Sequence, residues 1–193
     1  MLFNAHEFID FMRHHGIVQH HEIPITLKSG ETSHLYVNWR KAAHDAFLMN
    51  AVVGYVLNFA TDQGIQPDTF YGVPEGATIL GVLTQFHYAK NQGFTTGSHA
   101  LAMGRRQPKS HGDPTDRHFI GVPRGRVCVL EDVTTTGGSL IDCIRQLNHN
   151  GINVTAAISL TNRNPDDKGP RSVHGQLAAL QVPYYSLSDA SAL

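Results

Sequence analysis

The sequence predicts an α/β fold in which a central parallel β-sheet is flanked by helices. Short apolar runs alternate along the chain with longer segments of helical periodicity, and polar or glycine-rich turns follow the runs. This alternation is typical of parallel sheets whose loops carry the chemistry. With 193 residues, 41% of them hydrophobic and 16% charged, the chain can bury a sizeable core. We therefore expect a single domain, residues 1–193, without internal repeats.

The N-terminal segment predicts a helix followed by a small antiparallel element. Residues 3–15 carry apolar side chains at helical spacing, and Gly16 follows as a C-terminal cap. Residues 23–27 are extended, residues 28–33 form a turn, and residues 35–39 alternate like a strand.

A helix, a strand and a second helix are expected next. Residues 46–61 form an amphipathic pattern that Gly64 ends. Residues 69–72 are a short apolar strand, and a turn at 73–77 leads into a helix from about residue 78 to residue 89.

Periodicity is lost between residues 104 and 123. A further strand is expected around Leu101, but the stretch after it has little apolar content and several Pro and Gly residues. Such a stretch inside a compact domain indicates a functional loop or local disorder. Its basic side chains are Arg105, Arg106, Lys109, His111, Arg117 and His118.

The segment 127–140 organises the chain. Residues 127–130 predict a strand buried on both faces, which Glu131 and Asp132 close. A turn rich in hydroxyl groups and glycine follows, and then a helix begins. The apolar face of this helix comprises Leu140, Ile141, Ile144 and Leu147.

The turn between this strand and this helix suits a ribose 5-phosphate. Backbone N–H groups and the helix N-terminus attract an anion, glycines allow a phosphate close to the backbone, and the two carboxylates can accept hydrogen bonds from sugar hydroxyls. A turn of this kind taken alone more often only caps a helix. The expected phosphate cradle comprises Thr134, Thr135, Thr136, Gly137, Gly138 and Ser139.

The remaining chain predicts two more strands and a helix. Gly151 ends the preceding helix, and residues 154–160 form an apolar strand from which residues 161–165 emerge. Residues 173–180 predict a helix, and residues 182–187 a last strand.

Composition excludes several classes of function. The net charge of −1 gives no electrostatic reason to bind nucleic acid or an acidic membrane, and no apolar run reaches membrane-spanning length. Cys128 and Cys143 fall in apolar segments and suit a reducing cytoplasm. The 13 histidines lack metal-ligand spacing, so we interpret most of them as surface residues.

The fourteen residues 127–140 resemble the phosphoribosyl-pyrophosphate signature of type I phosphoribosyltransferases. They match neither a Walker loop, because no Lys follows the glycines, nor the dinucleotide-binding glycine spacing. The resemblance implies a parallel sheet flanked by helices, with a small N-terminal hood subdomain made largely of residues 1–40.

Four other segments resemble orotate phosphoribosyltransferases in particular. Residues 26–38, which include Lys28 and Tyr36, are similar to the hood over the pyrimidine, and residues 72–77 lie where pyrophosphate is received. Residues 105–112 resemble the mobile catalytic loop, which we assign to 104–123, and Arg163 falls where the orotate carboxylate is held.

The resemblance implies transfer of a 5-phosphoribosyl group from 5-phosphoribosyl 1-pyrophosphate to orotate, with Mg²⁺ held mainly by the substrate. It further implies a homodimer in which the loop 104–123 completes the neighbour's site. Arg105, Lys109 and His111 are expected to act on the leaving pyrophosphate, together with Arg106 and, at the ribose, Glu131 and Asp132.

Some positions depart from the family pattern, and two other functions compete. His34 and Val37 differ within the hood, Arg106 replaces a frequent Lys, and Glu75 adds a negative charge beside a polyanion. The alternatives are a phosphoribosyltransferase for another nucleobase and a non-catalytic regulator that binds the same donor. Without the order of motifs, the basic loop would be interpreted as solvated and Arg163 as a surface salt bridge.

Overall fold

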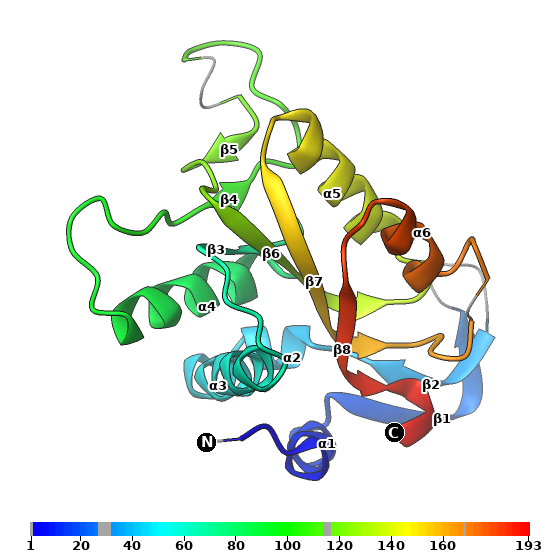
Figure 1. The fold of residues 1–193 in the computed structure, drawn as a ribbon. Helices are drawn as coiled ribbons and strands as arrows, with labels where there is room; N and C mark the ends of the chain where they lie inside the picture. The colour runs from blue at the N-terminus through cyan, green and yellow to red at the C-terminus, as the bar shows by residue number, and fades with distance from the viewer. Residues whose placement is uncertain (1, 27–31, 114–116, 168) are drawn as a thin grey trace.

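A computed structural model describes residues 2–26, 32–113, 117–167 and 169–193. Four parallel strands form the central sheet in the order β3-β6-β7-β8, so the predicted parallel sheet is confirmed (Figure 1). Their bounds are Thr69–Gly72 (β3), Arg126–Thr134 (β6), Asn153–Asn162 (β7) and Tyr184–Asp189 (β8).

Helices cover both faces of this sheet, with α3 and α4 on one side and α5 and α6 on the other (Figure 1). The predicted helices are all present, while the short α2 and the C-terminal 3₁₀ turn were not predicted. The bounds are Ala5–His14 (α1), Arg40–Ala43 (α2), Ala46–Asp62 (α3), Thr78–Asn91 (α4), Gly138–His149 (α5), Val173–Ala179 (α6) and Ala190–Ala192 (η2).

Strand β6 is buried on both faces, as its apolar run predicts. Cys128 and Leu130 pack in the core shared with α1, α3 and α4, whereas Val127 and Val129 pack in the core shared with α5 and α6. Alternate side chains of a strand point to opposite faces, so one run supplies both cores. Burial raises the pKa of the Cys143 thiol on α5 to about 12, which fits a core residue.

The N-terminal element is an antiparallel hairpin of β1 (Val18–Thr26) and β2 (Thr32–Val37). Residues 28–31 of the predicted turn lie outside the described residues, whereas Thr32 and Ser33, which were assigned to the turn, begin β2 because they pair with Thr26 and Ile25. The hairpin has an irregular register between His20 and Ile25. It lies at the edge of the domain near the carboxyl end of the sheet (Figure 1).

The strand expected around Leu101 is corrected by the structure. Strand β4 starts later, at Met103–Gly104, and pairs antiparallel with β5 (Phe119–Ile120) instead of joining the central sheet. The loop 104–123 therefore leaves and returns through a two-stranded ribbon. Phe119 anchors this ribbon, because its side chain is buried and its ring centroid lies 6.2 Å from that of Tyr71. Phe119, Ile120 and Val122 are the only apolar residues among the twenty at positions 104–123, which is too weak a signal for periodicity analysis.

Candidate active site

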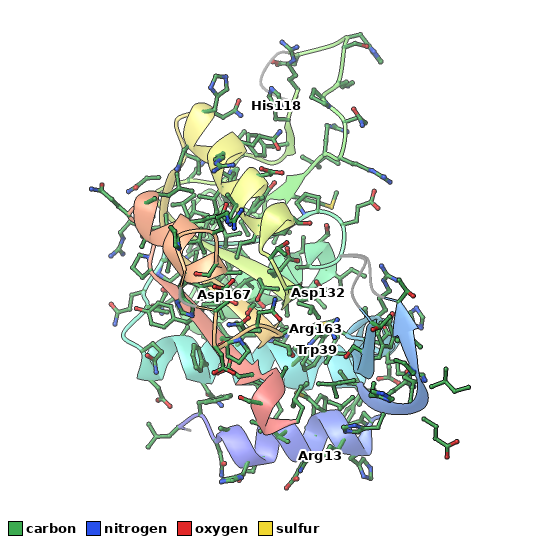
Figure 2. The ribbon with its side chains drawn as sticks, turned by 90° about the vertical axis from the view of Figure 1, so that its right-hand side faces the viewer. Arg13, Trp39, His118, Asp132, Arg163 and Asp167 are labelled. Atoms are coloured by element: carbon green, nitrogen blue, oxygen red, sulfur yellow. The ribbon has the colours of Figure 1, made fainter. Side chains whose placement is uncertain are left out.

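A cavity of about 700 Å³ opens at the carboxyl end of the sheet, between the hairpin and the loops that follow the strands. Parallel α/β sheets bind ligands at this edge because their loops converge there. Asp132, Arg163 and Trp39, which come from three separate segments, lie close together in Figure 2. The lining residues are Thr26, Tyr36, Val37, Asn38, Trp39, Arg40, Pro74, Glu75, Gly76, Arg106, Glu131, Asp132, Val133, Thr135, Ser139 and Arg163.

A smaller cavity of about 280 Å³ adjoins the first and is built by the predicted phosphate cradle. All six cradle residues line it, and Glu131, Val133, Thr135 and Ser139 line both cavities. Gly137 takes a left-handed conformation with φ of 76° and turns the chain into α5. No side-chain cap is found at the N-terminus of α5 within the described chain, and the residues of its first turn line the cavity, so their N–H groups are available to donate to an anion.

Thr134 contributes its backbone to the cradle, because its side chain points into the core. Its hydroxyl contacts the Tyr184 hydroxyl, which in turn lies 2.7 Å from Ser159 Oγ. Burial raises the pKa of Tyr184 to about 12, so this phenol stays neutral. The Thr134 carbonyl accepts a 2.8 Å hydrogen bond from the Arg163 N–H, which joins the cradle to the end of β7.

The acidic pair lies within β6 rather than after it, since the strand continues to Thr134. Glu131 is only 5% exposed, and one of its oxygens accepts a 3.2 Å hydrogen bond from the Asp132 N–H. Asp132 Oδ1 accepts a 2.8 Å bond from the Val133 N–H. Both carboxylates line the larger cavity, so acceptors for a sugar's hydroxyl groups stand beside the cradle.

Arg163 directly follows β7 and reaches across to the hairpin. Its Nη2 donates a 3.1 Å hydrogen bond to the Leu35 carbonyl of β2, while the side chain lines the cavity. Tyr36 of the same strand also lines the cavity. The structure thus brings together Arg163 and Tyr36, two of the three residues that the sequence analysis assigned to binding the nucleobase. Lys28, the third, lies outside the described residues.

Trp39 was not predicted as a cavity residue. Only 4% of it is exposed, its ring stacks on Phe8, and its Nε1 donates a 3.1 Å hydrogen bond to Thr161 Oγ1. Thr161 Oγ1 lies 3.0 Å from Ser188 Oγ, so the indole is tied to both β7 and β8. Apolar periodicity cannot distinguish such a wall from ordinary core.

Arg40 and Asn38 also line the cavity. Asn38 ends the segment 26–38 that resembles the hood, whereas Arg40 was not predicted there. Arg40 begins α2, and its backbone N–H donates a 3.2 Å bond to Asn38 Oδ1. An arginine next to a tryptophan carries no distinctive sequence signal, so Arg40 could not be found from the sequence. The four-residue helix α2, which follows the hairpin, places Arg40 beside the cavity.

The turn at 73–77 packs directly against the acidic pair. A Cβ atom at Gly76 would lie 2.9 Å from Asp132 Oδ2, so a larger residue would push the carboxylate aside. Glu75 forms an ion pair with Arg106 across the cavity mouth, with 3.7 Å between Oε2 and Nη1. Glu75 therefore lies at the cavity rather than turned away from it.

The other residues of the basic loop lie apart from the cavity. Arg105, Lys109 and His111 are not among the described residues that line it, and the loop extends beyond β4 and β5 (Figure 1). The backbone N–H of Arg105 bonds to His118 O at 2.9 Å and that of Lys109 bonds to Arg117 O at 2.8 Å. The structure thus places Arg106, but not Arg105, Lys109 or His111, at the cavity of its own chain.

No metal cluster and no membrane-spanning helix are found among the described residues. Nowhere in these ranges do three His, Cys, Asp or Glu side chains gather as they would around a metal ion. No described helix combines the length and apolarity needed to cross a membrane.

The fold is that of the type I phosphoribosyltransferases. The crystal structure of orotate phosphoribosyltransferase from Aeropyrum pernix superposes with a TM-score of 0.70 at 23% identity, covering 96% of this chain and 95% of that one. The Mycobacterium tuberculosis enzyme, solved in complex with 5-phospho-α-D-ribosyl 1-diphosphate, gives 0.63 at 18% identity, with coverages of 97% and 96%.

Sequence comparison identifies the family more narrowly. A curated protein from Methanospirillum hungatei, named orotate phosphoribosyltransferase, is 31% identical over 140 residues, which are 72% of this chain and 73% of that protein. A scan against protein-family models finds no match. The chain belongs to the orotate phosphoribosyltransferase family.

Proposed function

We propose that this protein transfers the 5-phosphoribosyl group from 5-phosphoribosyl 1-pyrophosphate to orotate, which yields orotidine 5′-monophosphate and pyrophosphate for UMP biosynthesis. One observation carries the proposal: an anion cradle at a helix N-terminus shares its wall with a larger cavity lined by Arg163. A phosphate at one end and a carboxylate at the other are the two anionic groups of orotidine 5′-monophosphate.

The donor occupies the cradle and the acidic pair. Its 5-phosphate accepts hydrogen bonds from the first N–H groups of α5 and from the hydroxyls of Thr135, Thr136 and Ser139. Glu131 and Asp132 hold the ribose hydroxyls beside it. The contact between Gly76 and Asp132 supports this placement, because it brings the pyrophosphate turn next to the ribose.

Orotate occupies the opposite side of the cavity. The Arg163 guanidinium matches its carboxylate with two parallel charge-assisted hydrogen bonds. Tyr36 packs against the pyrimidine, and Lys28, in the turn that the sequence predicts, adds a further cation. The reaction develops positive charge on the ribose and negative charge on the leaving group, so positioning and electrostatics supply most of the catalysis.

The leaving pyrophosphate is stabilised by Arg105, Arg106, Lys109 and His111, and His111 can donate a proton. Since Lys109 lies apart from the cavity of its own chain, we assign the loop 104–123 to the site of a second copy in a homodimer, with Arg106 near the start of the loop remaining beside the cavity of its own chain. A Lys109→Ala subunit mixed with an Asp132→Asn subunit should then regain one working site. Mixtures that stay inactive would refute the sharing of sites.

Mg²⁺ suits this site because its preferred ligands are oxygens. The ion commonly takes one or two carboxylates and completes its shell with phosphate oxygens and water. Asp132 and Glu131 supply such carboxylates beside the expected pyrophosphate, so the residues present fit the ion. When bound, Mg²⁺ neutralises negative charge on the pyrophosphate.

We place the protein in the cytoplasm, where its two buried thiols stay reduced.

The test is the loss of orotate absorbance when the protein is mixed with orotate, the donor and Mg²⁺. Turnover should occur in the wild type and fall steeply in Arg163→Gln. Arg145→Gln serves as the matched control, because Arg145 lies on α5 and its exposed side chain pairs with Asp142. Turnover of adenine or hypoxanthine without orotate would favour another base. Salt-sensitive nucleic-acid binding without any turnover would favour a regulator.

A further inference from the structure

Glu75 is a negative side chain where the proposed function expects a polyanion. It belongs to the turn assigned to pyrophosphate and lines the larger cavity. An uncompensated carboxylate there would repel the leaving group and weaken donor binding. The proposed chemistry gives Glu75 no task, so its position needs its own explanation.

The ion pair with Arg106 supplies that explanation. Glu75 Oε2 lies 3.7 Å from Arg106 Nη1, and the two side chains come from different loops at the cavity mouth. Both side chains are largely exposed, Arg106 at 75% and Glu75 at 68%. An exposed pair contributes little to stability and exchanges partners readily. The pair therefore connects the basic loop to the pyrophosphate turn without fixing it there.

We infer that Glu75 is a stand-in anion that binds Arg106 until pyrophosphate takes its place, and that it thereby sets the affinity for pyrophosphate. The inference rests on the proposed function. Pyrophosphate carries several charges and accepts two parallel bonds from a guanidinium, so it displaces a single carboxylate. The competition lowers the affinity for pyrophosphate, and the exchangeable ion pair places Arg106 beside the pyrophosphate turn before the donor arrives.

Neutralising Glu75 should therefore tighten the binding of inorganic pyrophosphate. Loss of an exposed competitor of this kind corresponds to about a twofold to fivefold lower Kd for Glu75→Gln at low salt. The gain should shrink as salt rises, since both charges are solvent-exposed. In an Arg106→Gln background the same substitution should have a smaller effect, because only the direct repulsion remains.

The experiment is titration calorimetry of inorganic pyrophosphate, with and without Mg²⁺, into the wild type, both single variants and the double variant. Asp142→Asn is the matched control, because Asp142 forms a similarly exposed pair with Arg145 at 3.6 Å on α5. Its Kd should stay unchanged. Ribose 5-phosphate, which probes only the cradle, should bind Glu75→Gln as it binds the wild type.

Three results would overturn the inference. Pyrophosphate could bind Glu75→Gln no more tightly than the wild type, or the gain could be equally large in the Arg106→Gln background. Binding could also weaken only when Mg²⁺ is present, which would make Glu75 a metal-ordering group. Orotate turnover is measured separately, so failure of the proposed function is distinguishable: the enzyme can turn over while Glu75 fails this test.

Discussion

Replacing Tyr184 by Phe tests how the core holds the phosphate cradle in place. The Tyr184 hydroxyl lies 2.7 Å from Ser159 Oγ and contacts Thr134 Oγ1, and all three residues are buried. Thr134 ends β6 and begins the cradle, and its carbonyl accepts the Arg163 N–H at 2.8 Å. The substitution removes one oxygen from a buried hydroxyl network without changing the size of the ring.

The magnitude follows from the contacts that remain. Thr134 Oγ1 keeps only long contacts, 3.4 Å to Ser159 Oγ and 3.5 Å to the Thr161 carbonyl. A buried hydroxyl left poorly satisfied costs about 1–3 kcal/mol. Because the Thr134 and Ser159 hydroxyls retain part of their hydrogen bonding, we expect a loss of about 1–2 kcal/mol in the free energy of unfolding. A shifted Thr134 should also weaken ribose 5-phosphate binding by about threefold to tenfold.

Equilibrium denaturation followed by fluorescence provides the measurement, because Trp39 is the single tryptophan. Tyr185→Phe is the matched control on the same strand. Tyr185 points to the opposite core, where its ring lies 6.4 Å from Phe59, and its loss of a hydroxyl should change stability by less than about 0.5 kcal/mol. Equal stability of the two variants, or unchanged ribose 5-phosphate affinity in Tyr184→Phe, would refute this account of the cradle.

Three further predictions concern the backbone and the thiols. Gly137→Ala should destabilise the protein by about 1–2 kcal/mol and weaken ribose 5-phosphate binding, because φ is 76° and the added Cβ would lie 2.7 Å from Val173 Cγ2. Calorimetric melting measures the stability and ligand titration measures the binding. A variant that matches the wild type in both would contradict this account of the turn. Gly54→Ala should stabilise by about 0.5–1 kcal/mol, because Gly54 lies inside α3 with open space around its Cβ position; a lower melting temperature would contradict this. Cys128 and Cys143 should react with a thiol reagent only on unfolding, because burial raises the pKa of both thiols; fast labelling of the native protein at pH 8 would contradict their burial.

The sequence alone identified the elements whose signals are local. Residues 127–140 form a strand, a turn and a helix in immediate succession, so their apolar run, glycines and helical face stand together in the chain. The cradle and the acidic pair beside it were therefore predicted residue by residue. The alternation of strands and helices, which repeats the same local unit, predicted the parallel sheet.

Local signals fail for elements that depend on distant partners. Strand β4 has only two residues and exists because β5 pairs with it, so its position was misplaced around Leu101. The four-residue α2 is too short for periodicity to reveal. Strand β6 continues through Glu131 and Asp132 because β7 pairs alongside it, and a run of apolar letters cannot show where that pairing ends.

Only the tertiary structure decided which residues form the walls and the mouth of the cavity. Trp39 becomes a cavity wall because Thr161 and Ser188 on two other strands fix its indole N–H. Glu75 meets Arg106 because two loops from different strands converge on one mouth. These contacts join residues far apart in the chain, and no spacing within the sequence encodes them. The residues of the expected phosphate cradle are consecutive in the sequence, so the sequence alone can reveal them. The shape of the cavity around the cradle depends on how the strands and loops of the sheet pack together.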